Sequence, residues 1–493
     1  MKFSFFEEPD LEFANGGTHV DMRFGIARFG PLDFGDTKAP AQLKVGFVGT
    51  DETISAMKGW LERCKSGISA KDSKLANLFP EFPGFSADAS FRASLTFHER
   101  WASSIRQREI DAVLTHSDGD ETVRQSVAMF LDHAEELVQQ GGPMVIVCVP
   151  PHDLLAAVDE RRGPVDADDQ EIDEGSEAPD AHKPPTIAFH DLLKAEGMRL
   201  SVPLQMVRPK TYQGKLPPGK KKNTGLKTPS MPLQDEATRA WNIHAALYYK
   251  AGGIPWRLLR DAAELTTCFV GVSFYRSLDK TRLLTSVAQV FNERGEGVIV
   301  KGGQAQLDKD DKTPHLSESD AHALLKKAIQ LYRQEHRTSP ARVVVHKTSR
   351  VTPEETAGFD AAAHEHSIDT VELLTVRRSL TRLFREGTYP PLRGTFLELQ
   401  SASGLLYLKG SVNFFETYPG MYVPRPLEFT AFRAETALDQ LAREMLSLSK
   451  LNWNNTQFDG GEPITVRAAR RVGDILKCVP EGGKVQPTFR FFM

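Results

Sequence analysis

TCFVGVSFYRSLDKTRLLTSVAQVFNERGEGVIVKGG (267–303) predicts the architecture of the second half of the chain. Its first ten residues, 267–276, are mostly apolar, which is typical of a central, buried strand. Residues 285–303 predict a β-hairpin that turns at Asn292–Gly297. The stretch therefore predicts three consecutive antiparallel strands.

The residues downstream of this stretch alternate between helix and strand patterns. We expect helices at 320–335, 353–365, 434–446 and 466–476, and strands at 341–347, 368–376, 394–400 and 404–410. Three antiparallel strands, a helix and then alternating strands and helices is the order of an RNase H-like fold.

The residues upstream of this stretch alternate between strand and helix patterns. LKVGFVGT (43–50), residues 110–116 and PMVIVCVP (143–150) are interpreted as strands, with helices at 53–65 and around 123–140. The strand pattern resumes at 185–190 and 202–207. Near-continuous apolar strands separated by helices predict a parallel sheet covered on both faces. We therefore expect an α/β chain with a doubly wound, Rossmann-like layer before the RNase H-like part.

Composition and charge exclude several classes of protein. The chain has 493 residues, of which 40% are apolar, and Lys+Arg 61 against Asp+Glu 65 gives a net charge of −4. A uniformly basic, nucleic-acid-coating surface is excluded. Its 4 cysteines are far apart, so neither a disulfide scaffold nor a zinc ribbon fits. The acidic N-terminus and the lack of a long apolar run predict a cytoplasmic protein without a membrane span.

Two stretches of opposite charge interrupt the first half of the chain. Residues 159–182 are strongly acidic, which is typical of a solvated insertion. Residues 208–227 are basic and rich in Gly and Pro. Either this second stretch is a solvated turn, or it contacts a phosphate backbone. The candidate backbone-binding residues are Arg208, Lys210, Lys220, Lys221 and Lys222.

Four residues form a candidate phosphate site: His190, Lys194, Gln205 and Lys250. His190 is expected at a strand end, and Lys194 follows one helical turn later, so both side chains would point the same way. Gln205 lies in an apolar strand, where a buried amide needs hydrogen-bond partners. An imidazole, an amide and two ammonium groups beside a helix N-terminus would suit a terminal phosphate. Alternatively, the lysines are separate surface charges and His190 is a satisfied structural residue.

The stretches HDLLK (190–194), PLQMVR (203–208) and NIHAALYYKAGGIPW (242–256) resemble the MID domain of prokaryotic Argonautes. Residues 11–35, 383–395 and 424–429 resemble the short Argonautes, which have MID and PIWI domains only. The resemblance implies an N-terminal segment (1–40) that packs on the junction of the two domains. It further implies a Rossmann-like MID domain (41–250) and an RNase H-like PIWI domain (251–493).

The resemblance also implies roles for individual residues. In this family the positions of His190, Lys194, Gln205 and Lys250 bind the 5′-phosphate of a guide strand. The C-terminal carboxylate, here that of Met493, often holds a divalent cation against that phosphate. We therefore expect Mg²⁺ bound by Met493 and Gln205, because oxygen ligands suit this ion.

The catalytic carboxylates of slicing Argonautes are replaced in this sequence. Ser273 in GVSF (271–274), Thr348 in HKTSR (346–350) and Asn452 in KLNWNN (450–455) stand at those positions. Two-metal cleavage needs anionic ligands, so we expect a protein that is not itself an enzyme. The resemblance implies a guide RNA, a single-stranded DNA target and an APAZ-domain effector as partners. That effector would be a sirtuin-like or TIR-type NAD hydrolase, or a nuclease, acting in defence against plasmids and phages.

Two other functions stay open at this point. A catalytically active PIWI nuclease would need displaced acids, for which Asp279 and Glu296 are candidates. A Rossmann-type small-molecule enzyme is disfavoured because VGTDET (48–53), after the first strand, is not a G-x-G-x-x-G loop.

Overall fold

The computed structural model describes residues 1–158, 186–214, 233–259, 265–291, 297–308, 310, 312–384, 390–420, 423–458, 460–480 and 482–493. These residues form two compact units. The four-stranded unit comprises residues 40–72, 79–253 and Met493. The nine-stranded unit comprises residues 1–39, 73–78 and 254–492. The acidic insertion and most of the basic stretch lie outside the described residues.

The four-stranded unit is built on a parallel sheet. Its strand order is β5-β4-β6-β7, where β5 is Ser94–Ser104, β4 is Gln42–Gly49, β6 is Val145–Val149 and β7 is Leu204–Met206. Every neighbouring pair in this sheet is parallel. All five residues of β6 are buried, as expected for a strand covered on both faces. The predicted doubly wound, Rossmann-like layer is therefore confirmed.

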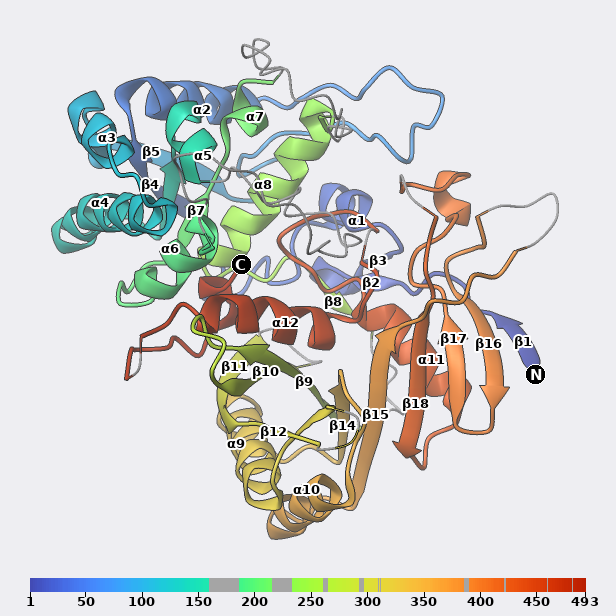
Figure 1. The fold of residues 1–493 in the computed structure, drawn as a ribbon. Helices are drawn as coiled ribbons and strands as arrows, with labels where there is room; N and C mark the ends of the chain where they lie inside the picture. The colour runs from blue at the N-terminus through green and yellow to red at the C-terminus, as the bar shows by residue number, and fades with distance from the viewer. Residues whose placement is uncertain are drawn as a thin grey trace. The chain divides into compact units, whose positions relative to one another are not determined.

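Two layers of helices accompany this sheet (Figure 1). The first layer consists of α3 (Gln107–Leu114), α4 (Gly119–Gln140), α5 (His152–Val158) and α6 (Phe189–Gly197). In the second, α2 (Asp51–Lys65) packs against α7 (Pro209–Tyr212), and Trp60 of α2 lies against His244 of α8 (Glu236–Lys250). This packing places α6 and α8, the two helices with candidate lysines, in the same unit.

Two strand predictions in this unit were wrong. Residues 110–116 were predicted as a strand, but residues 110–114 are the end of helix α3. The sheet strand in this part of the chain is β5. As an edge strand, β5 exposes residues 98–100, so its apolar alternation is interrupted. Residues 185–190 also form no described strand, because Phe189 begins helix α6. Buried Phe189, Leu192 and Leu193 follow helical spacing, which becomes visible only over the longer segment.

The nine-stranded unit contains a large mixed sheet with the order β1-β16-β17-β18-β15-β14-β9-β10-β11. Strands β9, β14 and β15 are parallel, whereas β9, β10 and β11 form the predicted antiparallel meander. The turn of the meander at 292–296 lies outside the described residues. The strands are β1 (Lys2–Phe5), β9 (Thr267–Arg276), β10 (Leu283–Phe291), β11 (Gly297–Gln304), β14 (Arg342–Lys347), β15 (Thr370–Arg378), β16 (Thr395–Gln400), β17 (Ser403–Leu406) and β18 (Leu427–Arg433). This arrangement confirms the RNase H-like architecture.

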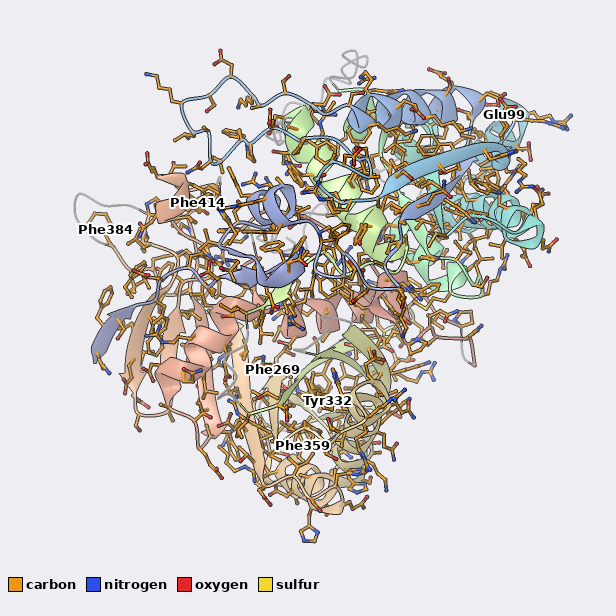
Figure 2. All side chains as sticks on the ribbon, turned by 180° about the vertical axis from the view of Figure 1, so that it is seen from behind. Glu99, Phe269, Tyr332, Phe359, Phe384 and Phe414 are labelled. Atoms are coloured by element: carbon orange, nitrogen blue, oxygen red, sulfur yellow. The ribbon has the colours of Figure 1, made fainter. Side chains whose placement is uncertain are left out.

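Helices cover both faces of the sheet's centre. On one face, α9 (Glu318–His336) and α10 (Pro353–Glu365) bury Tyr332 and Phe359 in the main apolar core, as Figure 2 shows. On the other face, α12 (Ile464–Leu476) lies directly on β9. A Cβ atom at Gly271 would lie 2.1 Å from the carbonyl oxygen of Thr465, so only glycine permits this close approach. Helix α11 (Leu438–Leu448) packs on β16 and β17.

Shorter elements complete the nine-stranded unit. Strands β2 (Leu11–Glu12), β3 (Thr18–His19) and β8 (Arg257–Leu258) form a small sheet beside helix α1 (Met22–Phe29), and β12 (Gln306–Leu307) pairs with β13 (Pro314–His315). Short 3₁₀ turns lie at Ala14–Gly16, Asn413–Phe415 and Phe489–Phe491. No helix in the described ranges is both long and apolar enough to cross a membrane.

The buried His244 predicts that the four-stranded unit loses stability in mild acid. Its ring stacks between Phe82 and Phe85, and burial lowers its pKa to about 4. Because the unfolded chain binds this proton near pH 6.5, stability should fall as the pH drops below 6.5 and level off near 4. The loss should be on the order of 3 kcal/mol. Urea unfolding at pH 4–7 measures this loss of stability. His244→Phe should flatten the dependence of the unfolding free energy on pH. If the variant and the wild-type protein show the same pH dependence, His244 is not its cause.

Candidate functional site

Lys194 is buried on helix α6, with only 3% of its surface exposed. Its Nζ donates to the carbonyl oxygen of Leu204, 2.5 Å away, and to the terminal oxygen of Met493. The buried side chains of α6 and its packing against α4 hold the lysine in this position. The ammonium group is therefore fixed next to strand β7, which carries Gln205.

Lys250 is the last residue of helix α8 and reaches the same oxygen. Its Nζ donates to the terminal oxygen of Met493, and the residue is 1% exposed. The chain turns away after Lys250 at Gly252, whose φ of 100° favours glycine. Burial and the adjacent Lys194 lower the pKa of Lys250 well below its ordinary value. The structure thus joins two lysines at the backbone oxygen of Met493 in one cluster.

Gln205 and His190 lie on the elements that carry this cluster. The amide nitrogen of Gln205 donates to the carbonyl oxygen of Met206 at 3.1 Å. Its Oε1 is buried and has no hydrogen-bond partner in the described part of the chain. His190 lies in the first turn of α6, one turn before Lys194, and not at a strand end as expected. Its Nδ1 is 3.1 Å from Oδ1 of Asp191.

Sequence reasoning missed two groups at this site. Asp191 is a carboxylate that is only 1% exposed, and it provides the partner of His190. The carbonyl oxygen of Leu204 accepts from Lys194. Asp191 is adjacent to His190 in the sequence, which is a usable signal, but its burial becomes evident only in the folded unit. A backbone carbonyl leaves no signal in the residue types.

The oxygen atoms at this site fit the expected Mg²⁺. The backbone oxygen of Met493 and the unpartnered Oε1 of Gln205 are both hard oxygen donors. Mg²⁺ is commonly held by one or two carboxylates together with substrate phosphates and water. Met493 and Gln205 would therefore hold the ion, which would supply positive charge between the carboxylate and a bound phosphate.

The basic candidates after β7 are only partly described. Arg208 precedes the short helix α7, and Lys210 lies exposed on it. The carbonyl oxygens of Lys210 and Thr211 accept hydrogen bonds from Arg239 of α8, which ties α7 to that helix. Lys220, Lys221 and Lys222 lie outside the described residues.

Ser273 and Thr348 lie side by side in the nine-stranded unit. Ser273 is on β9, and Thr348 directly follows the parallel strand β14. The backbone N–H of Thr348 donates to the carbonyl oxygen of Val272 at 3.1 Å, so the two hydroxyl residues are on neighbouring strands. Both belong to the face that α12 covers, because side chains alternate along a strand and Gly271 contacts α12. Two neutral hydroxyl residues therefore lie on neighbouring strands at the carboxyl ends of the parallel strands.

Asn452 and His346 both have hydrogen-bonded side chains, and His346 is the last residue but one of β14. Asn452 lies in the loop after α11, where its Oδ1 accepts from the backbone N–H of Asn454 at 3.2 Å. His346 lies within β14, and its Nδ1 is 2.8 Å from Oγ1 of Thr465. Burial lowers the pKa of His346 to about 3. His346 is therefore a neutral, hydrogen-bonded group at neutral pH.

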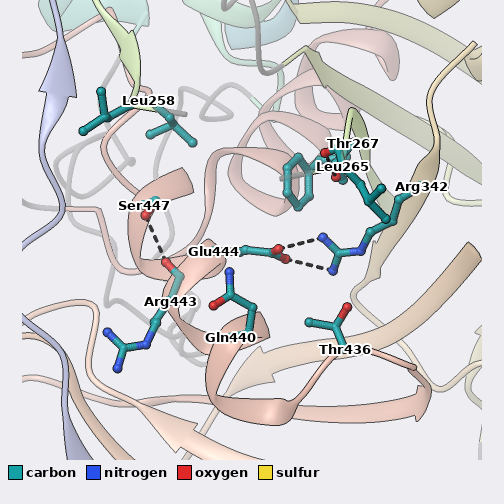
Figure 3. A pocket seen from close by; sticks show the side chains of 11 residues that line it. Leu258, Leu265, Thr267, Arg342, Thr436, Gln440, Arg443, Glu444 and Ser447 are labelled. Carbon is teal, nitrogen blue, oxygen red and sulfur yellow. Dashed lines mark hydrogen bonds and ion pairs between the residues drawn. The ribbon is translucent and has the colours of Figure 1, made fainter. Parts of the chain in front are cut away.

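A cavity of about 370 Å³ lies at the opposite end of these strands (Figure 3). It is lined in part by Thr267 and Arg342, which begin β9 and β14. Arg342 donates to both carboxylate oxygens of Glu444, at 2.6 and 3.1 Å, and also pairs with the buried Glu372. The cavity is thus separate from Ser273 and Thr348, and its central arginine is neutralised by two carboxylates.

Replacing Arg342 by methionine should destabilise the nine-stranded unit by about 3–5 kcal/mol, because it leaves the fully buried Glu372 without its cation. The matched control is Arg433→Met, whose partner Asp360 is 48% exposed at its side chain. That change should cost less than about 1 kcal/mol. Urea unfolding of both variants tests the difference, and equal losses would show that the Arg342 network does not stabilise the fold.

Comparison with solved structures shows which known proteins share this architecture. The Clostridium butyricum Argonaute bound to a guide DNA and a 19-mer target DNA matches with a TM-score of 0.62 and 16% identity, over 98% of this chain. The chain has the Argonaute fold. Drosophila Piwi matches 99% of the Argonaute-fold chain, with a TM-score of 0.58 and 14% identity. The Marinitoga piezophila Argonaute in complex with a 5′ OH guide RNA matches the whole of the Argonaute-fold chain, with a TM-score of 0.53 and 11% identity.

The Argonaute-fold chain spans about half the length of these proteins: 54% of the Clostridium chain, 56% of Piwi and 59% of the Marinitoga chain. No protein-family model matches its sequence, and no curated protein matches it. The four-stranded unit has the Rossmann-like architecture of a MID domain, and the nine-stranded unit has the RNase H-like architecture of a PIWI domain.

Proposed function

We propose that this chain is a guide-dependent nucleic-acid-binding protein that holds the 5′-phosphate of a guide in the Lys194–Lys250 cluster. The observation that carries this proposal is the convergence of two buried lysine side chains on the backbone oxygen of Met493. A phosphate placed beside this oxygen could accept charge-assisted hydrogen bonds from both Nζ atoms. Its negative charge would favour the protonated form of Lys250. His190 and Gln205, on α6 and β7, would complete the contacts.

We take the guide to be RNA and the target to be single-stranded DNA, as the family resemblance implies. Solved neighbours carry a guide DNA with a target DNA in one case and a guide RNA in another. In such a division of labour, base pairing reads the sequence while the protein holds the backbone and terminal phosphate. Arg208, Lys210 and the basic residues 220–222 are the proposed backbone contacts. Mg²⁺ at Met493 and Gln205 would assist the phosphate contact.

The PIWI-like unit is proposed to hold the guide–target duplex without cutting it. Ser273 and Thr348 are neutral where two-metal cleavage requires anions, so neither residue can hold a metal ion as a carboxylate does. The function would then depend on a partner. We propose an APAZ-domain effector that depletes NAD or degrades nucleic acid when guide and target are both bound. This role in cytoplasmic defence against plasmids and phages rests on the family resemblance.

Co-expression with the neighbouring reading frame and purification of the complex test the effector part of the proposal. NAD hydrolysis or nuclease activity should appear only when a 5′-phosphorylated guide and its complementary target are both added. Activity that is independent of guide and target, or that never appears with both, would contradict effector control by this chain.

Extending the chain beyond Met493 should weaken guide loading, because the terminal carboxylate would become a peptide group and its charge would be lost from the cluster. We expect a C-terminal hexahistidine extension to lower 5′-phosphorylated guide affinity at least tenfold in Mg²⁺. The same extension at Met1 is the control. Fluorescence anisotropy measures both, and normal loading by the C-terminally extended protein would refute a role of the carboxylate.

A further inference from the structure

Four cations surround one short segment next to the paired hydroxyls Ser273 and Thr348. The segment is 460–462, just before helix α12. Glu462 is only 5% exposed, and its Oε1 lies 3.3 Å from Nε of Arg378 and 3.2 Å from Nη1 of Arg470. A Cβ atom at Gly461 would lie 3.2 Å from Cε of Lys409, and one at Gly460 would lie 3.7 Å from Nη1 of Arg467. Glu462 is therefore a nearly buried carboxylate that pairs with two arginines at once.

The strand register puts this cluster on the same face as Ser273 and Thr348. Lys347 pairs with Thr375, so Thr348 is opposite Val376, and Arg378 is two residues further along β15. Two residues along a strand correspond to about 6.6 Å and return the side chain to the same face. Arg470 comes from α12, the helix that covers this face. Arg378 is thus on the same face as the hydroxyls, one strand and two residues away from Thr348, at the carboxyl ends of the parallel strands.

The charges and exposure of the cluster fit an extended anion. The side chains of Arg378 and Arg470 are 31% and 39% exposed, whereas that of Glu462 is 6% exposed. Their guanidinium groups are thus accessible to solvent while the carboxylate that positions them is not. Guanidinium groups are suited to bidentate contacts with phosphate oxygens.

We propose that Arg378 and Arg470, positioned by Glu462, form a phosphodiester clamp on the nucleic-acid strand that crosses Ser273 and Thr348. This inference rests on the proposed function and deepens it, because it assigns a second backbone-binding site that is separate from the guide 5′-phosphate cluster. A slicing centre would hold metal ions against the backbone at this face. Here fixed side-chain cations take up the backbone charge, which fits a site that retains its target.

The experiment compares two double variants with the same change in net charge. In Arg378→Gln/Arg470→Gln the proposed clamp is removed. In the control, Arg377→Gln/Arg471→Gln, the adjacent residues are changed; Arg377 is 63% exposed and pairs with Glu428 instead. Binding of a fluorescent single-stranded DNA target to guide-loaded protein is measured by anisotropy between 50 and about 300 mM salt.

The clamp variant should bind target at least tenfold more weakly at low salt, while the control changes less than threefold. The log–log salt slope should fall by about 1.4–1.8 units in the clamp variant, as expected for two lost phosphate contacts. Loading of the 5′-phosphorylated guide should be unchanged in both. Equal effects in the two double variants would overturn the clamp. Failure of the wild-type protein to load guide would instead overturn the proposed function.

A second variant keeps the test valid if the clamp variant folds poorly. Glu462→Gln keeps the shape of the side chain and an oxygen that can still accept from both arginines and position them, while it removes the negative charge between them. It should tighten target binding two- to fivefold at low salt and steepen the salt dependence. Unchanged or weaker target binding by a folded Glu462→Gln protein would count against the clamp.

Discussion

Replacing Lys194 and Lys250 together by alanine is expected to weaken binding of a 5′-phosphorylated guide by about 10²–10⁴-fold. Each lysine would donate one charge-assisted contact to the phosphate, worth roughly 1.5–3 kcal/mol, and tenfold in affinity corresponds to about 1.4 kcal/mol. Binding of a 5′-hydroxyl guide of the same sequence should change far less. Both affinities are measured by anisotropy at one salt concentration.

The control for this experiment is Lys44→Ala/Lys71→Ala, which removes two exposed lysines from the same four-stranded unit. It separates a loss of net charge from a loss of the cluster. Thermal unfolding shows whether the buried variant is folded. If a folded Lys194→Ala/Lys250→Ala protein loses affinity equally for both guide types, the phosphate assignment is wrong.

Guide-loaded protein is expected to bind a complementary single-stranded DNA and leave it intact, in Mg²⁺ or Mn²⁺. The hydroxyls of Ser273 and Thr348 lack the charge that would hold two metal ions beside the scissile phosphate. Ser273→Asp alone should not create activity, because Thr348 still provides no second anion. Denaturing gels of end-labelled target, after long incubation with excess protein, are the measurement.

Cleavage of the target at a fixed distance from the guide's 5′ end would overturn this expectation and establish the active-nuclease alternative. Of the two acids considered for it, Asp279 is exposed in a turn after β9, where it hydrogen-bonds to Ser277 and Thr281. Glu296 lies outside the described residues. An alanine variant of the responsible acid would then abolish the cleavage.

The sequence by itself determined the elements whose signals are local. The strand 267–276 was predicted with its observed bounds because all but one of its inner residues are buried and most of them are apolar or small. The helix 353–365 was also predicted exactly; Thr352 and Glu355 form a capping box and Pro353 occupies its first turn. In both elements the neighbouring residues along the chain carry enough information to specify the conformation.

Only the tertiary structure decided the conformation of residues 94–116 and 186–190. An edge strand with an exposed middle and a short helix with few buried residues do not produce a clear period in the sequence, and residues 186–190 contain only the first two residues of helix α6. Their conformations depend on the sheet and helices against which they pack. Local propensity is a weak preference that such packing overrides.

The candidate sites also contain features that the sequence identified and features that only the tertiary structure decided. The residue types of Lys194, Lys250 and Gln205 could be singled out from motifs, but Lys194 and Met493 are 299 residues apart, and only folding brings their charges together. The Arg378–Glu462 pair, 84 residues apart, left no signal in the sequence at all. Burial of a charged group depends on elements that are distant along the chain. The sequence alone therefore identified candidate residues, whereas the tertiary structure determined which of them share a site.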